Sequence, residues 1–116
     1  MSKTLENLVA KANRKGVAVL NGRQREWNGY VGRLEEKYKV KINNNKVELY
    51  HWGTKTLEID TDKKEVNHVY GISNSDRDSV NYMLNKFSLP FHTHYYPSKD
   101  KFELHDSRTD EVIISI

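Results

Sequence analysis

The sequence predicts an α+β domain, in which an N-terminal helix and one central helix pack on a mostly antiparallel sheet of meander hairpins. Two observations predict this fold. Residues 70 to 87 contain the end of a strand, a polar loop and the start of a capped amphipathic helix. Segments with the two-residue period of strands lie on both sides of it. The 116 residues are enough for one core but not two, so a single domain is expected.

Residues 3 to 15 are predicted to form the first helix. Ser2 can cap it, Gly16 can end it, and basic residues occupy the last turns, where they favour the helix dipole. Its apolar residues recur at helical spacing: Leu5, Leu8, Val9 and Ala12. Residues 17 to 20 are predicted to be a short buried strand. The remainder of residues 1 to 36 has no assignable pattern and is expected to be irregular.

Two hairpins are predicted between residues 38 and 69. Tyr38, Val40 and Ile42 alternate with lysines, and the asparagines 43 to 45 suit a tight turn. With Asn44 and Asn45 as the loop, Ile42 faces Val47, Val40 faces Leu49, and Lys41 faces Glu48 as an ion pair. In the second hairpin, Leu57 and Ile59 share a face, residues 60 to 64 turn, and Val66 returns.

The second helix is predicted over residues 76 to 87. Ser73 or Ser75 caps it, and Asp76 and Asp78 lie in the first turn, where negative charge is favoured. Its apolar stripe consists of Val80, Met83, Leu84 and Phe87, and Pro90 prevents its extension. Three further strands are expected, at 91 to 96, 101 to 105 and 111 to 116.

The net charge of +3 is distributed unevenly along the chain. Residues 1 to 41 carry ten Lys or Arg against four Asp or Glu, whereas the remainder is net acidic. Cations mixed with aromatic residues are typical of surfaces that bind nucleic acid or an acidic protein. The alternative is an ordinary solvated helix face. The candidate binding residues are Lys11, Arg14, Lys15, Arg23, Arg25, Trp27 and Tyr30.

Three of the five histidines lie in the predicted hairpin of residues 91 to 105. If residues 97 to 100 form its loop, His94 lies opposite Glu103 and His92 lies opposite His105, all on one face. Imidazole nitrogens with a carboxylate form a candidate zinc site. The alternative is that a polar strand face holds polar residues and no ion. His51 and His68 are interpreted as structural.

Other features of the sequence exclude several classes of protein. There is no cysteine, which excludes disulfides and thiolate metal sites and agrees with a cytoplasmic location. No apolar segment reaches the roughly 20 residues of a membrane span. No nucleophile elbow, zinc-protease helix or phosphate-binding glycine loop is present. The protein is therefore expected not to be an enzyme, and neither a catalytic residue nor a membrane partner is predicted.

One block resembles a pattern in small proteins of phages and prophages of Gram-positive bacteria. It runs from His51-Trp-Gly-Thr-Lys-Thr-Leu to Tyr70-Gly-Ile-Ser-Asn-Ser-Asp-Arg-Asp-Ser-Val-Asn. Some proteins of this genomic setting are type II-A anti-CRISPR proteins, so the resemblance implies an inhibitor that binds Cas9 or its guide-RNA complex in the host cytoplasm. A small basic nucleic-acid-binding regulator is the alternative, and a metal-dependent enzyme comes third.

Overall fold

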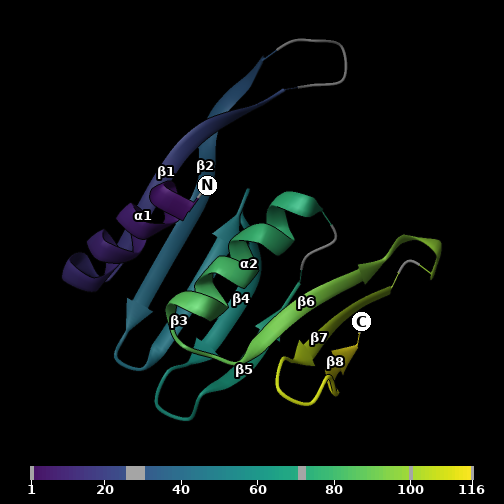
Figure 1. Cartoon of the computed structure of the whole chain (residues 1–116). Helices are drawn as coiled ribbons and strands as arrows, with labels where there is room; N and C mark the ends of the chain where they lie inside the picture. The colour runs from purple at the N-terminus through teal and green to yellow at the C-terminus, as the bar shows by residue number, and fades with distance from the viewer. Residues whose placement is uncertain (1, 26–30, 71–72, 100, 116) are drawn as a thin grey trace.

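The computed structural model describes residues 2–25, 31–70, 73–99 and 101–115, and it confirms the predicted α+β fold. The chain forms two antiparallel sheets rather than one (Figure 1). The larger sheet has the order β1-β2-β3-β4-β5, with strands β1 (Val17–Arg25), β2 (Val31–Asn43), β3 (Lys46–His51), β4 (Thr54–Asp60) and β5 (Glu65–Val69). The smaller contains β6 (Phe91–Tyr96), β7 (Lys101–Asp106) and β8 (Val112–Ser115), with a short 3₁₀ helix, Pro97–Lys99, between β6 and β7.

The helices α1 (Ser2–Lys15) and α2 (Asn74–Lys86) lie on the same face of the five-stranded sheet (Figure 1). Ser73 is the N-cap of α2, because its hydroxyl accepts a hydrogen bond of 3.1 Å from the Asp76 N–H. The predicted stripe of α2 is confirmed for Val80, Met83 and Leu84, which are buried, whereas Phe87 is half-buried and follows the helix.

The predicted register of the β2–β3 hairpin is confirmed. Ile42 pairs with Val47, Val40 pairs with Leu49, and Asn44 takes the left-handed conformation of the turn, with φ of 55°. Lys41 does lie opposite Glu48. The predicted ion pair between them is wrong, however, because Glu48 instead binds Lys55 of β4 at 3.1 Å.

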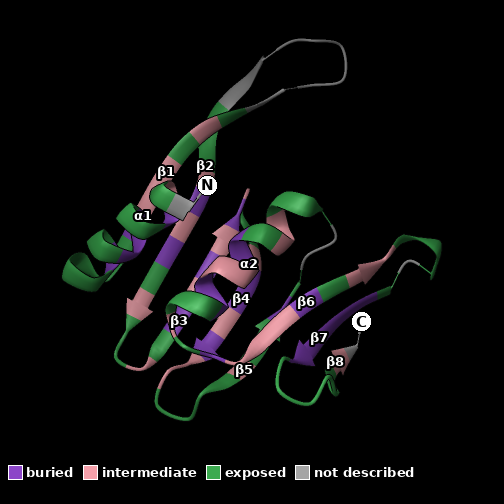
Figure 2. Cartoon of the chain, viewed as in Figure 1, coloured by how far each residue is buried: buried purple, intermediate pink, exposed green. Residues whose placement is uncertain are grey.

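The segment after residue 20 that was predicted to be irregular is mostly strand in its described part. β1 extends to Arg25 and β2 begins at Val31, so the two strands form a long hairpin that extends beyond the helices (Figure 1). Its described outer part, residues 21 to 23 and 34 to 36, is largely exposed (Figure 2). Without a buried face, nothing selects alternating apolar residues, and the two-residue period is therefore missing from the sequence. Val17, expected to be buried, is 43% exposed.

Both sheets contribute to one hydrophobic core. Leu49, Leu57 and Ile59 of the larger sheet are fully buried under the helices. Phe102 and Leu104 of β7 belong to the same buried cluster, as their predicted core-facing position requires (Figure 2). Phe91 and Tyr95 of β6 are partly buried against it. Strand β6 packs beside α2, which joins the smaller sheet to the larger one.

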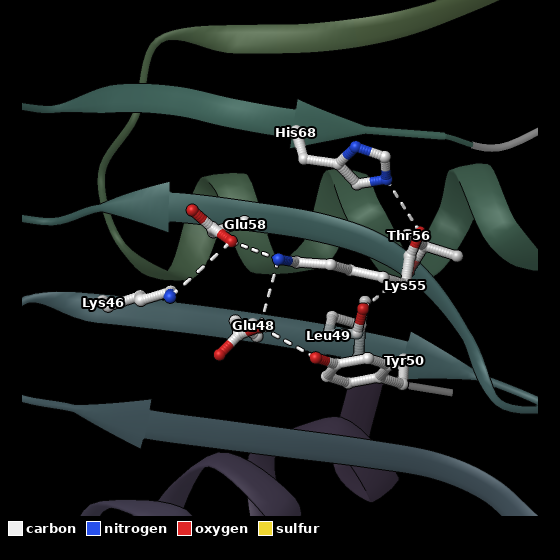
Figure 3. Close-up of polar contacts among 8 residues, drawn as sticks. All are labelled: Lys46, Glu48, Leu49, Tyr50, Lys55, Thr56, Glu58 and His68. Carbon is white, nitrogen blue, oxygen red and sulfur yellow. Dashed lines mark hydrogen bonds and ion pairs between the residues drawn. The ribbon is translucent and has the colours of Figure 1, made fainter.

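The face of the larger sheet opposite the helices carries a polar network centred on Lys55 (Figure 3). The Lys55 ammonium binds Glu48 at 3.1 Å and also binds Glu58. Tyr50 donates a hydrogen bond of 2.8 Å to Glu48, and Lys46 lies 4.0 Å from Glu58. The hydrogen bond from Lys55 lowers the pKa of Glu58. Burial alone would raise the pKa of Glu48, but hydrogen bonds from Tyr50 and Lys55 outweigh it and lower that pKa as well.

Replacing Lys55 by glutamine is expected to lower the free energy of unfolding by about 0.5 to 1 kcal/mol at pH 7, since the pairs are partly exposed. Carboxylates with lowered folded-state pKa values stabilise the protein above their unfolded-state pKa of about 4.3, and this contribution disappears as the pH falls through the folded-state values. The cost of Lys55→Gln, measured by urea unfolding, is therefore expected to be smaller at pH 3 than at pH 7. Lys99→Gln, at an exposed position, is the control. An equal cost for Lys55→Gln at both pH values would contradict the expectation.

Candidate functional site

The exposed side of α1 forms one candidate binding surface. Its apolar residues, Leu5, Leu8, Val9 and Ala12, are buried, which fixes the rotation of the helix on the sheet. Lys11, Arg14 and Lys15 are exposed, and their spacing of three and four residues places them side by side on the helix. We call these three residues the cationic stripe. None of the three forms an ion pair with another described residue.

The other predicted residues of the basic surface belong to the β1–β2 hairpin. Arg23 is exposed on β1, opposite Leu34 of β2. Arg25 is the last residue of β1, and its side chain lies outside what the structure describes. Trp27 and Tyr30 also lie outside the described residues. The structure therefore brings together the three cations of the helix, and the predicted mixture with aromatic residues stays a prediction.

The histidine-bearing hairpin has the predicted register, with His92 opposite His105 and His94 opposite Glu103. Its polar face is only partly exposed, however, since His94 is exposed but His92 is half-buried. Glu103 is only 6% exposed and His105 only 8%, and both lie on β7, the central strand of the smaller sheet. The His92 and His105 rings lie 5.4 Å apart between centroids, and the His94 and His105 rings lie 6.0 Å apart.

The side chains that converge in this hairpin differ from the predicted set. One donor atom each from His92, His105 and Asp110 lies within 4.8 Å of the others. His94 instead packs on Tyr96, with ring centroids 4.5 Å apart. Glu103 accepts a hydrogen bond of 2.9 Å from Nε2 of His105, so it holds a candidate ligand and lies outside the cluster of donors.

Asp110 is the residue that strand register could not identify. It lies in the turn between β7 and β8, in a left-handed conformation with φ of 61°, which aspartate tolerates better than most residues. There its carboxylate contacts Nδ1 of His105 at 3.0 Å. The hydrogen bonds with Asp110 and then Glu103 raise the pKa of His105, and the bond to His105 lowers the pKa of Asp110. This part of the hairpin therefore stabilises positive charge.

A cleft of about 480 Å³ lies where β3 meets the start of α2, and the sequence did not predict it. His51, interpreted as structural, contacts Asp76 through Nδ1 at 2.5 Å and stacks on Tyr38, with ring centroids 4.5 Å apart. Trp52 lines the cleft with φ of 51°, an uncommon conformation for a bulky side chain. The Ser73 hydroxyl at its edge is engaged as the helix cap. The His51–Asp76 contact therefore joins the sheet to α2.

Comparisons with protein-family models, with curated proteins and with solved structures gave no match. The resemblance to phage proteins therefore stays a prediction from the motif residues. Among the described residues, neither helix is long and apolar enough to cross a membrane.

Proposed function

We propose that this chain is a non-enzymatic, phage-encoded binding protein that inhibits a host defence nuclease, and that its target is Cas9 or the Cas9–guide RNA complex. The observation that supports binding is the cationic stripe, Lys11, Arg14 and Lys15, which is exposed and has no ion pair with a described residue. The phage origin and the target follow from the sequence resemblance alone.

The stripe suits a partner with a negative surface. Because the buried side of α1 is anchored in the core, the three cations are presented on a fixed helix, which reduces the entropy lost on binding. Charges that form no ion pair with another described residue remain available to accelerate and orient association with an acidic partner. A positive surface is repelled by any channel that binds phosphates through positive charges of its own. An acidic lobe of the nuclease, or the guide RNA itself, is therefore the expected contact.

The decisive experiment is co-elution with purified Cas9–guide RNA complex after charge reversal. The triple variant Lys11→Glu, Arg14→Glu, Lys15→Glu is expected to lose co-elution and inhibition of DNA cleavage. The matched control reverses three exposed lysines elsewhere, Lys63, Lys86 and Lys99, and changes the net charge equally. Because glutamate near a helix C-terminus opposes the dipole, the glutamine versions of the stripe and circular dichroism check that α1 stays folded. An equal loss of co-elution in the two triple variants, or no loss in either of them, would reject the stripe as the contact.

The same stripe also fits the alternative, a nucleic-acid-binding regulator. In that case the wild-type protein binds free DNA or RNA, and the logarithm of the affinity falls linearly with the logarithm of salt concentration, by about 0.7 to 0.9 per phosphate contact. Three lysine and arginine contacts would give a slope of roughly −2 to −3. The inhibitor is expected to co-elute with Cas9 and to show no affinity for free DNA.

A further inference from the structure

We propose that His92, His105 and Asp110 bind one zinc ion, or another divalent transition metal of similar preference, and that Glu103 positions His105 for it. The site is independent of the cationic stripe and of the proposed target. It rests on three observations: the convergence of donor atoms, the hydrogen bonds behind them, and the position of Asp110 in its turn.

The donor atoms suit zinc in type and in spacing. Two imidazole nitrogens and a carboxylate oxygen are ligands that zinc takes readily, at about 2.0 to 2.2 Å. Tetrahedral ligands on one zinc ion therefore lie roughly 3.4 Å apart. Nδ1 of His105 and Oδ1 of Asp110 are already 3.0 Å apart, and all three donor atoms lie within 4.8 Å of one another. The widest of these separations therefore exceeds the tetrahedral value by at most about 1.4 Å.

The hydrogen bonds behind His105 are those of a histidine metal ligand. A ligating histidine usually donates its other ring N–H to a carboxylate, which fixes the tautomer and raises the basicity of the ligand. Nε2 of His105 contacts the buried Glu103 at 2.9 Å, so the hydrogen placed there leaves the Nδ1 lone pair toward Asp110. Glu103 is itself held by Lys101, with its second oxygen 3.1 Å from the ammonium. His92 is oriented by Ser107, whose hydroxyl lies 2.9 Å from Nδ1.

In a competing explanation of this cluster, His105 carries a second proton and no metal ion is bound. Two carboxylates around His105 would also hold its imidazolium form, and that explanation needs only Glu103 and Asp110. The two explanations assign different roles to His92. A ligand is essential for zinc affinity, whereas the ion pair between His105 and the two carboxylates does not require His92. The bound ion would connect β6, β7 and the β7–β8 turn, with a fourth position left to water.

The test measures zinc binding to the full chain after treatment with a chelator, by calorimetric titration with zinc chloride at about pH 7.5, where neutral histidine is available. One zinc ion per chain is expected. Asp110→Asn and His92→Gln should each abolish saturable binding; neither residue is buried, so the fold should tolerate both changes. Glu103→Gln keeps a hydrogen-bond acceptor but removes the charge, and should weaken binding by about 10- to 100-fold. His68→Gln, on β5, is the control and should leave the affinity unchanged.

Three results would overturn the proposal. The first is the absence of saturable zinc binding, which would leave His105 as an imidazolium held by two carboxylates. The second is binding that survives both Asp110→Asn and His92→Gln. The third is a loss in His94→Gln as large as that in His92→Gln, since His94 lies outside the cluster of donors. Circular dichroism of each variant separates a lost ligand from a lost fold.

Discussion

Replacement of Leu104 by alanine is expected to lower the free energy of unfolding of the whole domain by about 2 to 5 kcal/mol, the range for large-to-small changes in a core. Leu104 lies on β7 of the smaller sheet and is 0% exposed. It belongs to the same buried cluster as Met83 and Leu84 of α2, and that helix covers the larger sheet. A cavity at Leu104 therefore removes contacts that both sheets share.

The measurement is urea unfolding followed by tryptophan fluorescence and by far-ultraviolet circular dichroism. In a Trp27→Phe background, the fluorescence comes from Trp52 alone, next to β3 and β4 of the larger sheet, whereas circular dichroism reports on the whole chain. For a single cooperative domain, both signals should move together to a lower urea midpoint. Ile113→Ala on β8, at a side chain that is 47% exposed, should cost less than about 0.5 kcal/mol. A fluorescence transition left unchanged by Leu104→Ala would show that the smaller sheet unfolds by itself.

The sequence predicted the fold best where one face of an element is buried. In the β2–β3 hairpin, the alternation of Val40 and Ile42 with lysines defined the buried face, and the asparagine turn then determined the register. A shift of one residue would expose the whole apolar set, so only one register agrees with the pattern. The stripe of α2 was predictable for the same reason. An element with one buried face therefore shows a regular spacing of apolar residues in the sequence.

Polar contacts were harder to predict, because they depend on tertiary neighbours. Lys41 lies opposite Glu48, as register requires, yet Glu48 binds Lys55 on its other side, and a two-strand argument cannot rank those neighbours. Asp110 contacts His105 from a turn that follows the paired strands, so strand register could not identify it. The β1–β2 hairpin extends beyond the helices, and its described outer residues, 21 to 23 and 34 to 36, lack a buried face and carry no two-residue period. In each case the outcome depends on where other segments of the chain lie in the fold, which the local sequence pattern does not specify.

The effect of a tertiary contact that the sequence pattern did not reveal is expected to be largest at Asp76. Its replacement by alanine is expected to lower the free energy of unfolding by about 2 to 4 kcal/mol. Sequence reasoning gave Asp76 and Asp78 the same role at the start of a helix, which is worth about 0.3 to 1 kcal/mol at a surface. The structure adds a hydrogen bond of 2.5 Å that Asp76 accepts from Nδ1 of His51, a buried side chain. Losing a bond to a charged group and leaving a buried partner unsatisfied costs roughly 1.5 to 3 kcal/mol more.

Asp78→Ala is the matched control, because Asp78 is also near the start of α2 but is exposed. It should cost no more than the dipole contribution, and equal costs for the two variants would contradict a specific role of Asp76. Combining Asp76→Ala with His51→Phe tests the pair directly. The phenylalanine preserves the stacking on Tyr38 but needs no acceptor. The cost of Asp76→Ala should therefore be smaller in the His51→Phe background, with a coupling energy of about 1 to 3 kcal/mol. Additive costs would mean that Asp76 stabilises the helix alone, without connecting it to the sheet.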